Sequence, residues 1–203
     1  MLENDQSIWQ TFIEGNRSSY RQLMESNYRA LYNYGIKFSQ DPEIVRDCIQ
    51  DLFMNLWVKR ESISKTVNTK AYLFSSLRRL LHRKIVSVNK HKYSIIDVPF
   101  IDAFTFQVSI EQKIITNEST VHIAKRIAAS LQNLPGRQRE IIYLKYFHDF
   151  SRDQIAEAMN ISPQTVSNLL QIALKKLKST FKPGFDPDTL FILLPMILTE
   201  IIF

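Results

Sequence analysis

Two blocks of basic side chains are the first feature of this sequence that suggests a function. Their positive charge suits binding to a polyanion. Residues 59–92 carry a net charge of +9 and residues 122–182 carry +6, whereas the segments 1–58, 93–121 and 183–203 each carry −3. Two basic blocks separated by an acidic stretch can grip a polyanion at two places. Solvated helix faces would give the same pattern, so charge alone leaves both interpretations open.

A helix-turn-helix is the most specific local pattern, and it lies within the second basic block, between residues 134 and 178. Ser151 and Gln154 have the spacing of a capping box, in which the Ser side chain caps a helix and the Gln side chain reaches back. Asn160 tolerates the left-handed conformation that a short turn often needs. Ser162-Pro163 then caps and starts the next helix.

The segments on either side of this turn agree with the pattern. Leu134-Pro135 opens the preceding helix. The second helix has a polar N-terminal face and an apolar stripe at helical spacing, made by Val166, Leu170, Ala173 and Leu177. The C-terminal end of this helix carries three lysines, Lys175, Lys176 and Lys178. Two short helices joined in this way are typical of DNA binding, although any helical hairpin shares part of the pattern.

Three amphipathic helices are predicted in the first half of the chain, enough to close one small core. The first spans residues 18–39, with Ser18 or Ser19 as its cap. The second starts at Asp41-Pro42, an N-cap followed by Pro at the first helical position. The third starts near Asn68 or Thr69 and buries a stripe made by Leu73, Leu77, Leu80, Leu81 and Ile85.

Composition excludes several classes of protein. With 203 residues, of which 45% are hydrophobic and 23% charged, the chain is globular, as one domain or two small ones. Its 4 Gly and 7 Pro disfavour an all-β fold. The lone Cys48 excludes an intrachain disulfide, and no Cys/His cluster has zinc spacing. No secretory signal is visible, so we expect a soluble, cytoplasmic, mostly helical protein with no metal or other cofactor.

Two further segments are predicted to connect or extend the helical modules. Residues 93–119 are acidic and contain Phe100, Phe104 and Phe106, which predicts an extended linker that lies in a groove. Residues 183–203 hold an apolar run that a Pro interrupts, and it is shorter than the roughly 20 residues of a membrane helix. We expect a docking tail, which contacts either the chain's own domains or a partner through Leu190, Phe191, Leu194, Ile197 and Phe203.

Taken in order, these segments resemble the extracytoplasmic-function (ECF) sigma factors of bacterial RNA polymerase, within the sigma-70 superfamily and in a Bacteroidetes-like form. Asp47 to Trp57 (DCIQDLFMNLW) is similar to the family's region 2.2, and Asn68 to Lys84 is similar to regions 2.3 and 2.4. Leu134 to Leu177 is similar to region 4, the helix-turn-helix. The similarity covers residues 18–92 and 120–180, most of the chain.

The resemblance implies an all-α fold with two small helical domains, joined by an extended linker and followed by a hydrophobic tail. The implied parts are an N-terminal extension at 1–17, region 2 at 18–92, the linker at 93–119, region 4 at 120–182 and the tail at 183–203. In this family region 2.2 binds the clamp coiled coil of the largest polymerase subunit. That role carries over to Asp47, Gln50, Asp51, Phe53 and Asn55.

The resemblance also implies two DNA-binding surfaces. Regions 2.3 and 2.4 open and read the −10 element, a role that carries over to Lys70, Tyr72, Phe74, Arg78, Arg79, Arg83 and Lys84. For Phe74, packing in the core is an equally good interpretation. Region 4 reads the −35 element, a role that carries over to Gln164, Thr165, Ser167, Asn168, Gln171, Lys175 and Lys176.

The sequence departs from the family at two of these places. Arg79 stands where the family often has an Asn that helps to capture a flipped −10 base. Leu169, Ile172 and Leu174 stand in the recognition helix where many members carry Arg. Since each lost bidentate base contact weakens discrimination by about 1–3 kcal/mol, we expect relaxed promoter specificity.

The predicted function is therefore a transcription initiation factor, and not an enzyme, that binds core RNA polymerase and promoter DNA and aids −10 melting. An additional partner is expected to contact the tail: an anti-sigma protein, the polymerase flap region, or a DNA-targeting factor that is a protein or RNA-guided. The alternative is a stand-alone helix-turn-helix regulator with a helical N-terminal domain. A peripheral membrane adaptor acting through the tail would leave both basic blocks unused.

Overall fold

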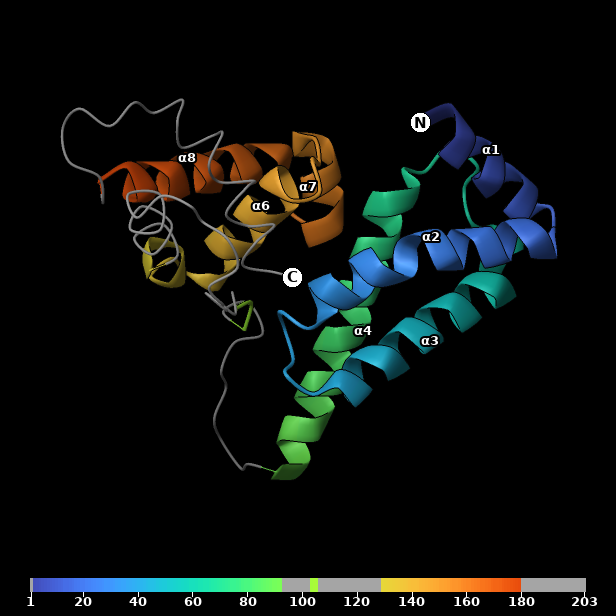
Figure 1. Cartoon of the computed structure of the whole chain (residues 1–203), viewed down its shortest axis with the longest axis horizontal. Coiled ribbons are helices and arrows are strands. Elements are labelled where there is room, and N and C mark those ends of the chain that lie inside the picture. Colours follow the sequence, from blue (N-terminus) through green and yellow to red (C-terminus); the bar gives the residue numbers. More distant parts are fainter. Residues whose placement is uncertain (1, 93–102, 106–128, 180–203) are drawn as a thin grey trace, which may run out of the picture. The chain divides into compact units, whose positions relative to one another are not determined.

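The computed structural model of the chain describes residues 2–92, 103–105 and 129–179. Within these residues the fold is all-helical, which confirms the predicted fold class (Figure 1). The chain divides into two compact units, one from residues 1–100 and the other from most of residues 101–203. The predicted docking tail at 183–203 lies outside the described residues, as does the linker except for residues 103–105.

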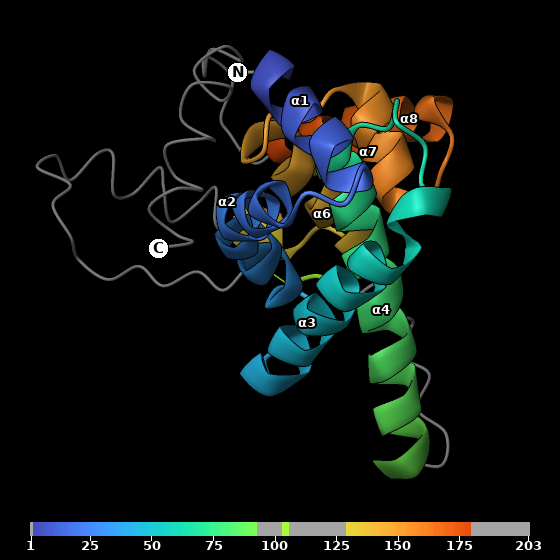
Figure 2. The same cartoon turned by 90° about the vertical axis from the view of Figure 1, so that its right-hand side faces the viewer.

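The N-terminal unit is built from four α-helices and one short 3₁₀ helix. They are α1 (Leu2–Ile13), α2 (Arg17–Gly35), α3 (Pro42–Lys59), η1 (Arg60–Ser62) and α4 (Thr69–Lys92). Helices α2, α3 and α4 pack on one another, and α1 lies against α2 and near the start of α4 (Figure 2). Three of these helices were predicted, and α1 was not.

Side-chain caps fix where these helices begin. Asp41 caps α3 as predicted, because its Oδ1 accepts a hydrogen bond from the Glu43 amide at 3.0 Å. Asn68 caps α4 in the same way, with its Oδ1 3.0 Å from the Ala71 amide. The prediction that Ser18 or Ser19 caps α2 is wrong. Asn16 is the cap, and its Oδ1 accepts from the amides of both serines, at 2.9 and 3.1 Å.

The core of this unit requires a close approach between α2 and α3. Leu31 and Tyr34 of α2 are buried with Val45 of α3 and Leu77 of α4. At Gly35 a Cβ atom would stand 2.6 Å from Cγ1 of Val45, closer than packed carbon atoms allow. A glycine is therefore needed at this crossing because any side chain would force the two helices apart.

Helix α1 belongs to the same core, although the sequence suggested only an N-terminal extension at 1–17. Trp9, Phe12 and Ile13 are buried. The Trp9 and Phe12 rings lie 5.4 Å apart between their centroids. Buried aromatic area is a large stabilising term, so the N-terminal unit is a four-helix fold rather than the predicted three-helix one.

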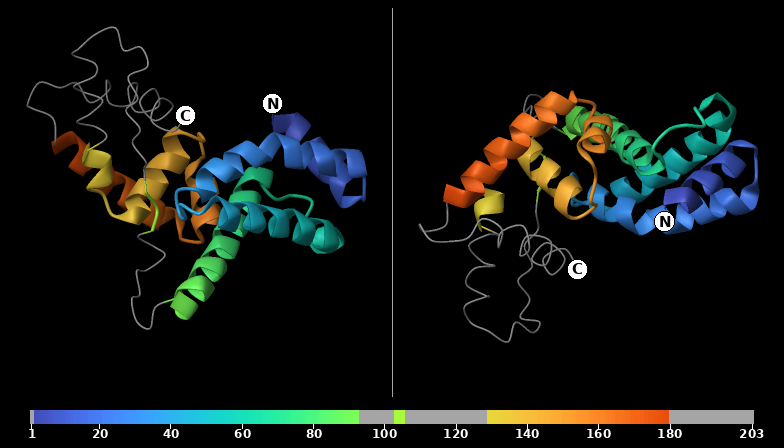
Figure 3. Two further views of the ribbon diagram at one scale, coloured as in Figure 1. Left: turned by 60° about the horizontal axis from the view of Figure 1, so that its bottom comes forward. Right: turned by 90° about the horizontal axis from the view of Figure 1, so that it is seen from above.

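The C-terminal unit contains α6 (Gly136–Tyr146), α7 (Arg152–Met159) and α8 (Pro163–Ser179). Helices α6 and α8 lie side by side (Figure 3). The predicted capping box is confirmed: the Gln154 amide donates to Ser151 Oγ at 3.2 Å, and the Ser151 amide donates to Gln154 Oε1 at 2.7 Å. Asn160 has a φ of 54°, as the predicted turn requires.

The start of α8 and the described part of the linker, residues 103–105, also agree with the predictions from the sequence. Ser162 Oγ accepts from the Thr165 amide at 3.1 Å and so caps α8. Val166, Ala173 and Leu177 are buried along one side of this helix. Phe104 is buried with its ring 5.5 Å from that of Tyr143, which agrees with a linker aromatic held in a groove.

Candidate functional site

The exposed face of α3 carries the side chains that the sequence linked to polymerase binding. Asp47, Gln50, Asp51 and Asn55 are all exposed. Their spacing of three or four residues places them in one stripe along the helix. Asn55 also donates through Nδ2 to the Asp51 carbonyl at 2.7 Å. This stripe offers carboxylate and amide oxygens to a basic, hydrogen-bonding partner.

Phe53 is not part of that surface. Its side chain is buried, and its ring meets the ring of Tyr20 edge-on at 6.3 Å. The sequence placed Phe53 among the binding residues, and the structure corrects this to a supporting role beneath the exposed stripe. The physical reason is its position on the same side of α3 as Ile49 and Leu56, which are core residues.

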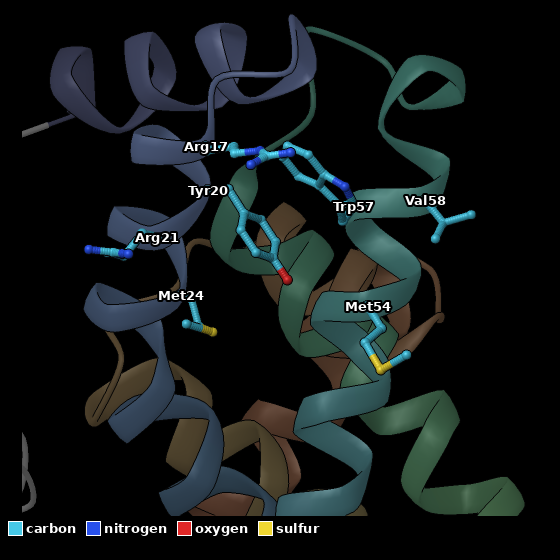
Figure 4. A pocket seen from close by; sticks show the side chains of 7 residues that line it. All are labelled: Arg17, Tyr20, Arg21, Met24, Met54, Trp57 and Val58. Carbon is cyan, nitrogen blue, oxygen red and sulfur yellow. The ribbon is translucent and has the colours of Figure 1, made fainter.

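An apolar groove continues the α3 stripe toward the C-terminal end of that helix. It has a volume of about 550 Å³ and lies between α2 and α3 (Figure 4). Its lining is mainly apolar, with two arginines from the first turns of α2: Arg17, Tyr20, Arg21, Met24, Met54, Trp57 and Val58. Met54 and Val58 are 57% and 75% exposed, so both apolar side chains are accessible to a partner.

Aromatic contacts hold the floor of this groove in place. The Tyr20 hydroxyl donates to the Phe53 carbonyl at 3.1 Å, so its ring bridges α2 and α3. The Tyr20 and Trp57 rings lie 5.0 Å apart. Burial raises the pKa of Tyr20 above its usual value, which keeps the hydroxyl protonated as a donor. No sequence pattern pointed to this groove, because it forms only where two helices meet.

The basic residues of α4 divide into exposed and partly covered groups. Lys70, Arg79 and Arg83 are exposed, while Arg78 and Lys84 are half-buried. Arg79 Nη2 donates to Ser76 Oγ at 3.2 Å. Lys84 Nζ lies 3.5 Å from Asp47 Oδ2, so a predicted DNA-binding residue pairs with a predicted polymerase-binding residue. Since both side chains still reach solvent, with exposed fractions of 42% for Lys84 and 56% for Asp47, this pair contributes little stability.

Tyr72 and Phe74 occupy different environments although only one residue separates them. Phe74 is 2% exposed, with its ring 4.8 Å from that of Tyr34. Its side chain is therefore a core residue, which corrects the expectation that it faces DNA. Tyr72 is only half-buried, so part of its side chain reaches the surface.

Tyr72 is supported by helix α1, which the sequence did not link to this surface. The Trp9 ring meets the Tyr72 ring edge-on at 5.7 Å. The Trp9 indole N–H also donates to the Ser64 carbonyl at 3.2 Å. Ser64 lies in the loop before α4, where Ser64 and Thr66 share a hydrogen bond of 3.0 Å and are both exposed. Trp9 thus joins this loop to Tyr72.

The outer face of α8 presents amide groups. Gln164, Asn168 and Gln171 are exposed, as are Lys175 and Lys176 further along the helix. Gln164 Nε2 donates to Asn168 Oδ1 at 3.0 Å. Two more of the predicted residues, Thr165 and Ser167, are half-buried near the start of the helix, and their hydroxyls already bond to Ser162 and the Pro163 carbonyl.

The three apolar residues that stand in α8 where many family members carry Arg differ in their exposure. Leu169 and Leu174 are half-buried. Ile172 is 46% exposed and lies on the same side of the helix as Asn168 and Lys175. Ile172 is therefore the apolar side chain that this face offers to a partner.

Within the part of the chain that the structure describes, no group of three or more His, Cys, Asp or Glu side chains could hold a metal ion. Among the same residues, no helix is both long and apolar enough to cross a membrane.

Family profiles match both units of the chain. Sigma-70 region 2 matches residues 23–90, and sigma-70 region 4 matches residues 124–177. Together they cover more than half of the sequence, with all of α3, α6 and α7 and most of α4 and α8. The chain belongs to the sigma-70 family of transcription initiation factors.

Its relatives place it among the ECF sigma factors. It is 23% identical to the ECF RNA polymerase sigma factor SigM of Bacillus subtilis, over 83% of this chain and 96% of the relative. It is also 23% identical to the ECF RNA polymerase sigma factor SigL of Mycobacterium tuberculosis, over 80% of this chain and 88% of the relative. The predicted ECF sigma factor family is confirmed, whereas the Bacteroidetes-like form stays a prediction.

Solved structures share the fold. One is CnrH in complex with the cytosolic domain of CnrY, with a TM-score of 0.55 and 20% identity over 86% of this chain and 95% of CnrH. Another is the sigma factor RpoE in complex with the anti-sigma factor NepR from Bartonella quintana, with a TM-score of 0.56 and 20% identity over 81% of this chain and 98% of that one. At this identity the likeness shows the fold alone.

Proposed function

We propose that this sigma factor binds core RNA polymerase through α3 and directs it to promoter DNA through α4 and α8. The observation that carries the proposal is the exposed stripe of Asp47, Gln50 and Asp51, because acidic and amide groups in one line suit a basic coiled coil. The groove beside Met54 and Val58 extends this stripe and accepts apolar side chains of the same partner. Catalysis then belongs to the polymerase.

In the −10 module, the proposal gives separate roles to basic and aromatic groups. Lys70, Arg79 and Arg83 neutralise backbone phosphates, a sequence-independent contribution that weakens with salt. Tyr72 stacks on a base as the duplex opens. Lys84 also contacts phosphate once DNA or polymerase has displaced its weak pairing with Asp47.

A second protein partner regulates or targets this factor in the same proposal. Two solved relatives of this fold are complexes, one of them with an anti-sigma factor. The recognition helix carries no Arg between residues 160 and 179, which favours relaxed promoter specificity. An anti-sigma protein, or a DNA-targeting factor that is a protein or RNA-guided, would dock on the tail at 183–203.

Binding to core polymerase tests this proposal directly. Asp51→Lys reverses one charge in the middle of the exposed α3 stripe, and a like-charge contact with the coiled coil should weaken binding more than about tenfold. Asp153→Lys makes the same change on α7, outside the proposed interface, and should bind as the wild type does. Equal binding of both variants would reject α3 as the polymerase-binding surface.

The stand-alone regulator is the alternative that this experiment also tests. Such a protein would bind duplex DNA through α8 and would show no affinity for core polymerase. The exposed α3 stripe has no role in it, which is why the sigma assignment is preferred.

A further inference from the structure

The exposed side of α8 combines amide groups with one exposed apolar side chain. Ile172 is 46% exposed and stands one turn beyond Asn168, with Lys175 and Lys176 one turn further on. The core side of this helix is already supplied by Val166, Ala173 and Leu177. Because Ile172 lies off that core stripe, the packing of the described residues does not account for an apolar side chain at this position.

The side-chain amides of Gln164 and Asn168, on the same side of α8 as Ile172, together offer one donor and one acceptor. Gln164 Nε2 donates to Asn168 Oδ1 at 3.0 Å, which orients both side chains before DNA arrives. Gln164 Oε1 is left as an acceptor and Asn168 Nδ2 as a donor. If both amides were reversed, the pair would still offer one donor and one acceptor. In the major groove adenine presents the complementary pattern, an N6 amino donor beside the N7 acceptor.

We propose that α8 reads A·T base pairs and that Ile172 contacts the C5 methyl group of a thymine. The proposal rests on the proposed function, since it assumes that α8 enters the major groove. Thymine is the base that offers an apolar group there, and guanine is read mainly by Arg or Lys. Residues 160–174 contain neither of these, so the first three turns of α8 are suited to adenine and thymine.

Replacing thymine by deoxyuridine gives the sharpest test, because it removes the C5 methyl group and leaves every hydrogen-bonding group in place. The full chain, assembled with core polymerase, is first used to select −35 duplexes from a random library. Each thymine of the selected duplex is then replaced by deoxyuridine in turn, and binding is measured for the wild type, Ile172→Ala and Ile172→Val.

One thymine should emerge whose replacement weakens wild-type binding about fourfold, the effect expected for one buried methyl group. In Ile172→Ala the same replacement should change binding by less than about twofold, because the two contact groups form one interaction. Ile172→Val keeps a branched apolar side chain and should retain most of the effect. A purely structural role of Ile172 would leave the deoxyuridine effect unchanged in all three proteins.

The outcomes separate this inference from the function on which it rests. Selected duplexes with guanine in place of A·T pairs, or a deoxyuridine effect that persists in Ile172→Ala, would overturn the thymine contact and leave DNA reading by α8 intact. Selection of no preferred sequence at all would overturn DNA reading by α8 and the thymine contact with it.

Discussion

Replacing Trp9 by Phe tests whether α1 holds the loop before α4 in place. The substitution keeps an aromatic ring beside Tyr72 and removes the indole N–H that donates to the Ser64 carbonyl at 3.2 Å. Loss of this hydrogen bond and of part of a fully buried side chain should together cost about 2 kcal/mol. For a unit of roughly 100 residues, this lowers the unfolding temperature by about 8–16 °C.

Two measurements check this prediction. Thermal unfolding followed by circular dichroism gives the loss of stability, and amide hydrogen exchange should show faster exchange at residues 62–68 well below the unfolding temperature. Thr11→Val is the matched control, because it removes a 2.7 Å hydrogen bond between α1 and Ser19 on the other side of the helix. Loop exchange as slow in Trp9→Phe as in the control would refute the proposed link between α1 and the loop.

Three further predictions concern packing, capping and the lone cysteine. Gly35→Ala should destabilise the N-terminal unit by about 1–3 kcal/mol in urea unfolding, because its Cβ would stand 2.6 Å from Val45 Cγ1; wild-type stability would contradict this packing. Ser151→Ala should lower the helix content and stability of the C-terminal unit by about 1 kcal/mol, whereas Arg152→Ala next to it should not. Burial raises the pKa of the Cys48 thiol to about 11. The folded state therefore favours the protonated thiol, so this contribution to stability is complete below pH 9 and is lost as the pH rises toward 11. A thiol reagent at pH 8 should label Cys48 only after unfolding, and rapid labelling of the folded chain would contradict its burial.

The N-terminal cap of a helix was predictable from the sequence where only one nearby residue could cap it. Asp41 precedes a proline and Ser151 has its capping-box partner three residues on, so each position was fixed by local chemistry. The cap of α2 was missed because Asn16, Ser18 and Ser19 are all good caps within one turn. The backbone decides among them, since Gly15 has a φ of 92° and turns the chain just before Asn16.

The functional surfaces were predictable only in part, because some depend on which elements meet. The acidic stripe of α3 follows from helical spacing alone. The groove between α2 and α3 depends on the pairing of the two helices, and the support of Tyr72 by Trp9 joins residues far apart in the chain. The position of Phe74 was ambiguous for a related reason. The residues beside it on α4 do not show whether its side chain points toward Tyr34 of α2 or toward solvent.

Mapping of transcription start sites is the most direct test of whether this chain acts as a sigma factor. Purified chain is added to core RNA polymerase free of other sigma factors, on a library of random-sequence DNA. We expect starts that require the chain, share weak upstream motifs and are lost with Asp51→Lys, whose folded state is checked by circular dichroism. If the chain neither binds core polymerase nor changes the pattern of starts, the sigma-factor function proposed here is contradicted.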